Sequence, residues 1–290
     1  MNSWDGERRE ERASAQTRVR MQTTIGIPKA SFFTHWLISV MVLTACVLLL
    51  AAAGPLVAQD DTSQAEGTVA WIFQNMEQVY ADCTTYSDSG VVKTIFFRAE
   101  GERVIEKPFT TAFVRPDRFR FEYVEQREDR RESRYIVWEN GPLVQVWWSI
   151  GPAEFLDCVD SSLSLALAGG TGISGGSAHT IPALLLPDEI GGWRLMDMTE
   201  AERIEDAYLD EVGCEVTAAS GSGTEFYRIQ GEFVTSPMTL WIEKETFLVR
   251  RIDKQNQFDD FRTKTTTTYS PAINGDISED MLKFGAPEQE

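Results

Sequence analysis

Two blocks of alternating apolar and polar residues constrain the fold of this chain most strongly. The clearest example is the segment RFRFEY at residues 118–123, in which Phe119, Phe121 and Tyr123 share one face and charged side chains share the other. A period of two is the pattern of a β-strand with one buried face. Similar segments run from residue 86 to 150 and from 198 to 270, separated by turn signals. The pattern predicts about ten strands in an antiparallel sheet, five in each block.

Helical spacing appears before the first block and between the two blocks. Thr68 is the predicted N-cap of a helix whose apolar residues begin at Val69. Between the blocks, the pattern predicts a helix over residues 153–168, within a helical and loop insertion that extends to residue 190. A sheet of about ten twisted strands curls, and its apolar concave face needs a cover. We therefore expect a mainly β, α+β fold in which the first helix and a lid over 153–187 cover a curled sheet.

The N-terminal 58 residues differ from the rest of the chain. A basic lead is followed by an apolar run over residues 32–58 and then by the polar linker 59–67. This order is typical of a signal peptide, with Met1 or Met21 as the start, and the run is also long enough for an inner-membrane anchor. Either interpretation places the main domain, residues 68–287, in the periplasm or cell envelope.

Charge and cysteine content exclude several classes of function. The chain carries 27 basic and 45 acidic side chains, for a net charge of −18, so it would repel nucleic acid and anionic headgroups, and any lipid would be held by its apolar chains. No cofactor is expected, because neither histidine nor cysteine spacing fits a metal site. Three cysteines follow the apolar run; Cys83 and Cys214 are the preferred disulfide pair, although Cys158 could replace either partner.

The stretch GGTGISGGSAH, residues 169–179, matches two catalytic patterns at once. It fits a dinucleotide-binding motif, but no strand precedes it and two prolines interrupt the following segment. It also fits a nucleophile elbow at Ser174 with His179 nearby, which leaves a serine hydrolase as a remote alternative. The preferred interpretation is a lid hinge at Gly170, Gly172 and Gly175, because glycine permits unusual backbone angles.

Four short sequence segments carry a resemblance to a known protein family. They are YSDSGV at 86–91, FTTAFVRPDRFRFE at 109–122, TLWI at 239–242 and TTTTY at 265–269. In this order, and with the helical interruption, the chain resembles the LolA/LolB-like superfamily of periplasmic lipoprotein carriers and receptors over residues 68–287. It resembles an uncharacterised DUF2092-type group of exported bacterial proteins more closely. The resemblance implies an unclosed β-barrel with helices as a lid over an apolar cavity that takes acyl chains.

Side chains on the inward face of the predicted sheet are the candidate ligand site. They are Phe119, Phe121, Tyr123, Val144, Val146, Trp148, Leu240 and Ile242. The same side chains would form a filled core in a protein that binds nothing in the sheet. We expect an exported, lipid- or lipoprotein-binding protein that is not an enzyme. The alternative is an envelope-sensing or protein-interaction domain on the same fold, either free or tethered by residues 32–58.

Overall fold

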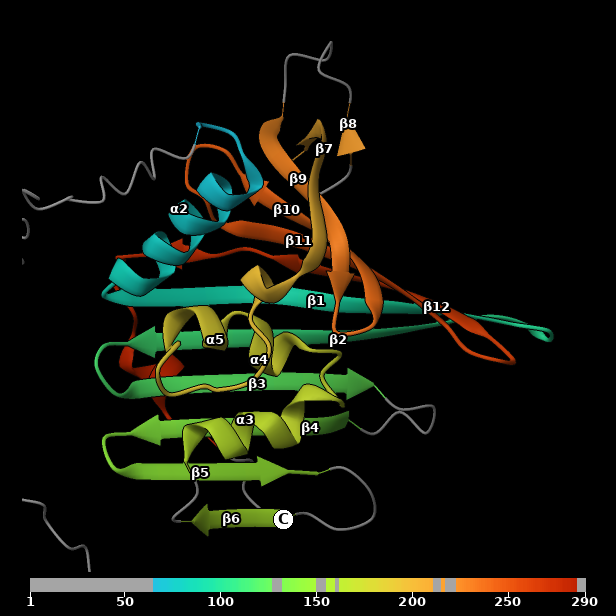
Figure 1. Ribbon diagram of the computed structural model, residues 1–290. Helices are drawn as coiled ribbons and strands as arrows, with labels where there is room; N and C mark the ends of the chain where they lie inside the picture. The colour runs from blue at the N-terminus through green and yellow to red at the C-terminus, as the bar shows by residue number, and fades with distance from the viewer. Residues whose placement is uncertain are drawn as a thin grey trace, which may run out of the picture. The chain divides into compact units, whose positions relative to one another are not determined.

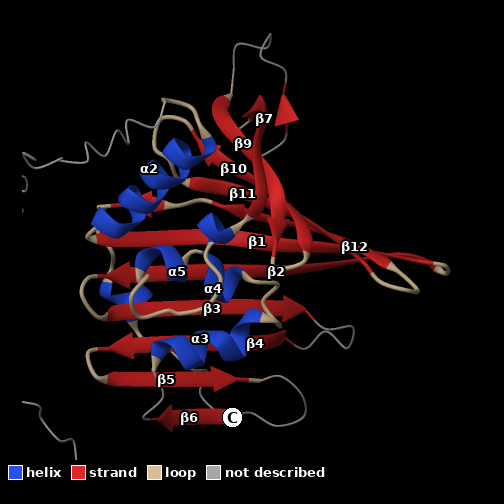
Figure 2. Cartoon of the chain, in the orientation of Figure 1, coloured by secondary structure: helices blue, strands red, loops and turns tan. Residues whose placement is uncertain are grey.

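The computed structural model describes residues 65–126, 132–149, 155–159, 162–210, 215–216 and 223–285 (Figures 1 and 2). These residues belong to a compact unit that spans Thr62–Glu290. No helix within them is long and apolar enough to cross a membrane. The predicted signal peptide or anchor at residues 32–58 lies outside the described residues.

The sheet contains thirteen strands in the described part of the chain. They are β1 (Thr85–Arg98), β2 (Gly101–Val114), β3 (Arg118–Gln126), β4 (Glu132–Asn140), β5 (Leu143–Trp148), β6 (Phe155–Val159), β7 (Thr199–Leu209), β8 (Glu215–Val216), β9 (Thr224–Phe233), β10 (Ser236–Glu243), β11 (Val249–Gln257), β12 (Arg262–Tyr269) and β13 (Ala272–Ile273). Twelve of them follow the order β6-β5-β4-β3-β2-β1-β12-β11-β10-β9-β7-β8, and β13 pairs with β1. The described order ends at β6 and β8, which do not pair, so the sheet is an unclosed barrel as predicted.

The helices lie together on one face of this sheet, which we call the inner face (Figure 2). They are α2 (Val69–Asp82), α3 (Leu163–Thr171), α4 (Ser177–Thr180) and α5 (Pro182–Leu185), with short 3-10 turns η1 (Leu195–Asp197) and η3 (Glu279–Leu282) elsewhere. Figure 1 shows α3, α4 and α5 in front of β2 to β5, while α2 lies in front of the second block of strands. We refer to residues 163–190, which contain α3 to α5, as the lid.

The first helix begins where the sequence predicts. The Thr68 side chain accepts a hydrogen bond from the backbone N–H of Trp71 at 3.3 Å, which satisfies one of the free amides of the first turn. Ile72, Met76 and Tyr80 are spaced at helical intervals and are fully buried against the sheet and the lid. The stripe of apolar residues therefore places α2 on the inner face.

The alternating pattern also places the strand faces correctly. In β3, Phe119, Phe121 and Tyr123 are buried, while Arg120 and Glu122 between them lie on the opposite, outer face. The β3–β4 register pairs Phe121 with Val137 and Tyr123 with Tyr135, so the neighbouring strand adds its own buried side chains to the inner face. One apolar core joins this face to α2 and the lid.

The predicted helix over residues 153–168 is wrong in its first part. Phe155–Val159 form strand β6, antiparallel to β5, and the helix begins only at Leu163. A short apolar run fits either period, and here the free edge of β5 offers backbone hydrogen bonds that a helix could not use. Ser162 marks the true start, because its hydroxyl accepts a hydrogen bond from the backbone N–H of Leu165 at 3.3 Å.

Candidate functional site

The eight predicted cavity residues lie on the inner face and are brought together there. Phe119, Phe121, Tyr123, Val144, Leu240 and Ile242 are buried in the core, and Val146 and Trp148 are partly buried against it. Aromatic rings form much of the floor: Tyr135 stacks on Tyr123 with ring centroids 6.0 Å apart, and Trp148 lies 6.0 Å from Tyr135. In this structure the floor is packed against the lid, so the predicted residues form a closed apolar interior.

The lid is held to the sheet by three side chains that donate hydrogen bonds to its backbone carbonyl oxygens. The hydroxyl of Tyr135 donates to Ala166 at 2.7 Å. The Arg115 guanidinium donates to Leu185 at 2.9 Å, and the Lys107 ammonium donates to Ile173. We call Lys107, Arg115 and Tyr135 the lid anchors. They fix α3, the glycine turn and α5, and the remaining contacts of the lid with the sheet are largely apolar.

Arg115 also joins the lid to the first helix. Its guanidinium donates to the carbonyl oxygens of Cys83 at 2.8 Å and Tyr80 at 3.0 Å, at the C-terminal end of α2. The last carbonyl groups of a helix lack partners within the helix, and a guanidinium is well suited to satisfy several of them. A single side chain from the β2–β3 turn thereby holds both covering segments.

The three predicted hinge glycines occupy different environments. Gly170 lies inside α3, where a Cβ atom would come within 2.7 Å of the Tyr135 ring. Gly172 has helical backbone angles and open space around it. Gly175 has a φ of +68°, and a Cβ there would lie 2.7 Å from a methyl carbon of Val92. The glycine turn is therefore shorter than the sequence suggested, at residues 172–176, and the hinge role itself stays a prediction.

The structure does not bring Ser174 and His179 together. The Ser174 hydroxyl is buried, donates to the Thr171 carbonyl oxygen at 3.3 Å and accepts from the Ala178 N–H at 3.1 Å. One ring nitrogen of His179 instead contacts the Gly191 carbonyl oxygen at 3.0 Å. A nucleophilic serine needs a base within hydrogen-bond reach and an accessible hydroxyl. In its described geometry Ser174 caps the turn before α4.

Three ionisable side chains on the inner face escaped the sequence analysis. Burial raises the pKa of the Asp88 carboxyl to about 6, although the Ser270 N–H at 2.7 Å and the Tyr86 hydroxyl at 3.1 Å donate to it. Burial also raises the pKa of Glu139 to about 7, with smaller contributions from the carboxylates of Glu189 and Asp117.

The third ionisable side chain is Lys254 in β11. Burial lowers the pKa of its ammonium group. Each of these residues occupies an inward position in an alternating strand, and that position was the available signal: a charged residue where the pattern calls for an apolar one.

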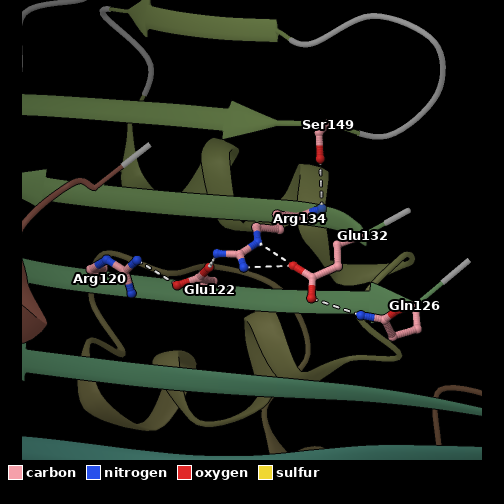
Figure 3. Close-up of polar contacts among 6 residues, drawn as sticks. All are labelled: Arg120, Glu122, Gln126, Glu132, Arg134 and Ser149. Atoms are coloured by element: carbon pink, nitrogen blue, oxygen red, sulfur yellow. Dashed lines mark hydrogen bonds and ion pairs between the residues drawn. The ribbon is translucent and has the colours of Figure 1, made fainter. Parts of the chain in front are cut away.

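The outer face carries a network of paired charges (Figure 3). The two oxygens of Glu122 accept from Arg120 at 2.6 Å and Arg134 at 3.2 Å, and Arg134 also pairs with Glu132 at 2.7 Å. The backbone N–H of Arg134 donates to the Ser149 hydroxyl at 3.0 Å. Because these carboxylates already accept from arginines, they are poorly placed to act as a general acid and base.

A groove of about 480 Å³ lies beside this network. Its lining comes from β1, β2, β3 and β12 and from the residue that follows β12: Ser89, Gly90, Val91, Pro108, Phe109, Thr110, Glu122, Val124, Thr268 and Ser270. The lining combines hydroxyl groups, apolar side chains and the carboxylate of Glu122, and the sequence analysis did not predict this groove.

The remaining sequence predictions concern cysteine and metal chemistry. Cys83 is a buried free thiol whose sulfur contacts the Tyr80 carbonyl oxygen at 3.2 Å. Cys214 lies outside the described residues, and so does the side chain of Cys158, so the Cys83–Cys214 disulfide stays a prediction. No group of histidine, cysteine, aspartate or glutamate within the described ranges could hold a metal ion.

Comparisons with known proteins show similarity at the level of solved structures. No protein-family model and no curated protein matches the sequence. A putative outer membrane lipoprotein-sorting protein domain from Vibrio parahaemolyticus is 10% identical, with 73% of this chain and 94% of that chain covered and a TM-score of 0.34. The structure of MucB is 10% identical, with 75% and 62% covered and a TM-score of 0.41. A LolA superfamily protein from Nitrosomonas europaea is 9% identical, with 74% and 97% covered and a TM-score of 0.28.

These similarities concern the fold and carry no argument about ligand or partner. The described sheet is antiparallel and unclosed, with helices on its inner face, which is the arrangement that the sequence resemblance implied. The narrower DUF2092-type grouping is not confirmed. The fold and the site define a mainly β, α+β domain with an apolar inner face under a lid of three short helices.

Proposed function

We propose that this chain is an exported binding protein that takes an apolar ligand, such as a lipid or a lipoprotein acyl chain, between the inner face of its sheet and the lid. One observation carries the proposal. The aromatic floor of the sheet is covered by short helices joined at a glycine turn and fixed at a few points, Lys107, Arg115 and Tyr135. Such a cover can separate from the floor without breaking any strand pairing.

The energetics favour an apolar ligand over a polar one at this place. A lifted lid exposes aromatic and aliphatic surface on both sides, and an acyl chain that fills the gap would regain about 0.8 kcal/mol for each methylene buried. At the aromatic floor a polar group would lose its hydration without compensation, because Phe119, Phe121 and Leu240 offer no hydrogen bond. Ligand binding is then an exchange of lid contacts for ligand contacts.

The direct test is the content of the purified protein. Protein purified from a membrane-containing host should yield a stoichiometric lipid on organic extraction. After delipidation it should take up a fluorescent fatty acid with saturation. Protein that is empty on purification and takes up no fatty acid would rule out the proposal.

Export is the second part of the proposal, and it is supported by the apolar run at residues 32–58. Fractionation of cells, followed by mass measurement of the protein, should place the domain in the periplasm or envelope. Loss of the segment that ends near Ala58 would identify a signal peptide. A full-length chain in the inner-membrane fraction would identify an anchor.

The groove on the outer face favours one second candidate, an envelope-sensing or protein-interaction domain. Its hydroxyl groups and apolar floor suit an extended polypeptide, and its volume falls in the range of ordinary binding clefts. A photo-crosslinking residue at Thr110 should then capture one protein partner in cells, whereas the same residue at the exposed Glu200 should not. Equal labelling from both positions would remove this candidate.

A further inference from the structure

Lys254 is a lysine on the inner face of the sheet. In β11 it follows the buried Ile252 by two residues, so the two side chains share that face. Its cross-strand neighbours are Met238 in β10 and Thr265 in β12. Its ammonium group lies 5.1 Å from the centre of the Phe233 ring. These three neighbours of Lys254 are apolar or uncharged.

Lys254 also lies beside the glycine turn of the lid. A Cβ atom on Gly176 would come within 3.7 Å of the Lys254 nitrogen. The other neighbour of the turn is Lys107 in β2, which donates to the carbonyl oxygen of Ile173. Two lysines from strands that are far apart in the sequence therefore flank the glycine turn of the lid, residues 172–176.

The two lysines differ in their ion pairs. Lys107 pairs with Glu125 at 3.0 Å. As a further comparison, Lys244, in the turn that follows β10, pairs with Asp206 at 2.6 Å and Glu225 at 2.7 Å. Within the described residues, Lys254 has no carboxylate at ion-pair distance. This absence is notable in a chain with 45 acidic side chains. Burying an ammonium group without an anion is costly, and the cost depresses its pKa.

We propose that Lys254 binds the anionic head, a carboxylate or a phosphate, of an amphiphilic ligand whose acyl chain lies under the lid. This inference rests on the proposed function. The acyl chain would occupy the aromatic floor, and its head would emerge at the glycine turn, next to a lysine for which the described residues supply no carboxylate partner. The net charge of the chain predicts repulsion of anionic headgroups, and Lys254 supplies the local attraction that overcomes it.

The test compares ligands that differ only in head charge. Displacement of a fluorescent fatty acid gives the Kd of dodecanoic acid and of its methyl ester for the full chain, delipidated. The wild type should bind the acid at least about tenfold more tightly than the ester, as expected for a charged hydrogen bond in a partly buried site. Lys254→Met should reduce this preference to nearly one, while leaving the Kd of the ester unchanged.

Two further variants control for folding and for general charge. Lys254→Arg keeps the cation and should retain most of the preference for the acid. Lys264→Met removes an exposed lysine from the outer face of β12 and should retain all of it. A matching series with dodecyl phosphate distinguishes the two heads: tighter binding than dodecanoic acid assigns a phosphate head, and weaker binding assigns a carboxylate.

The outcomes separate this inference from the proposed function. If wild type and Lys254→Met bind acid and ester equally, the inference is wrong and the apolar site stands. If neither ligand displaces the fluorescent probe because the probe itself does not bind, the apolar site falls as well. If Lys254→Met and Lys264→Met lose the preference to the same extent, surface charge is responsible and the assignment of Lys254 is overturned.

Discussion

Alanine substitutions at the three lid glycines should have three different effects on stability. Sequence patterns treat Gly170, Gly172 and Gly175 as equivalent, but the structure does not. The difference comes from the backbone angle at each glycine and from the atoms that a new methyl group would meet. These two quantities give the sign and the approximate size of each effect.

Gly175→Ala should be the most harmful. Its φ of +68° is left-handed backbone, which costs a residue with a side chain about 1–2 kcal/mol. The new methyl group would also lie 2.7 Å from a carbon of the buried Val92, and overpacking of a core costs about 1–3 kcal/mol. Together these give an expected loss of about 2–5 kcal/mol in the free energy of unfolding.

Gly172→Ala should stabilise the protein. The residue has φ −65° and ψ −43°, and nothing lies within 4 Å of the new atom. Alanine then restricts the unfolded chain at no cost to the folded one, a gain of about 0.4–1 kcal/mol. Gly170→Ala falls between, because a helix gain of about 1 kcal/mol opposes a contact of 2.7 Å with the Tyr135 ring.

Urea unfolding of the delipidated protein measures these differences as shifts of the transition midpoint at constant slope. The expected order of stability is Gly172→Ala, wild type, Gly170→Ala, Gly175→Ala. Equal shifts for the substitutions at 172 and 175 would refute the reasoning, because they would mean that the backbone of the turn differs from the one described here.

Three other predictions follow from the anchors and the ionisable groups. Arg115→Met should lower the free energy of unfolding by about 3–5 kcal/mol, since three carbonyl oxygens lose a charged donor. Arg194→Met, which removes a half-exposed ion pair with Glu77, should cost less than about 1 kcal/mol. Equal losses in urea unfolding would contradict the anchor role of Arg115. Ser174→Ala should leave any background esterase activity unchanged and cost about 1 kcal/mol, as for loss of a cap; an activity lost with normal folding would revive the hydrolase alternative. The raised pKa of Glu139 means that the folded state holds the proton of this carboxyl more tightly than the unfolded state, so its stabilising contribution is complete below pH 4.5 and is lost as the pH rises to about 7. Thermal melts of Glu139→Gln as a function of pH should lack this part of the decline in stability. Identical pH profiles for the wild type and Glu139→Gln would place the Glu139 carboxyl in solvent.

The sequence predicted the parts of the fold that depend on local periodicity. Alternation in residues such as 118–123 requires one buried and one solvated face, and Thr68 with the stripe that follows it requires a helix start. The inward side chains of the candidate site follow from the same rule, because side-chain direction along a strand is fixed once one face is known to be buried.

The errors and omissions arise where tertiary contacts decide. Phe155–Val159 form a strand because the edge of β5 is available for pairing. The sequence of these five residues alone does not indicate that such an edge lies beside them. Gly170 lies inside α3, where a side chain would meet the Tyr135 ring from β4. The environments of Glu139 and Lys254 depend on which segments cover them, and no period in the sequence records the position of the lid.

The central claim, that ligand enters between the sheet and the lid, can be tested by locking the lid to the sheet. A Cβ atom at position 175 lies 3.8 Å from the Cβ of Val92, which matches the separation of about 3.8 Å in a disulfide. The double variant Val92→Cys, Gly175→Cys is compared with Val92→Cys alone, both oxidised and both reduced, in uptake of a fluorescent fatty acid. The account predicts that the oxidised double variant takes up no fatty acid and regains uptake on reduction, while the single variant is unaffected by oxidation. Uptake by the locked protein at the rate of the reduced protein would contradict it.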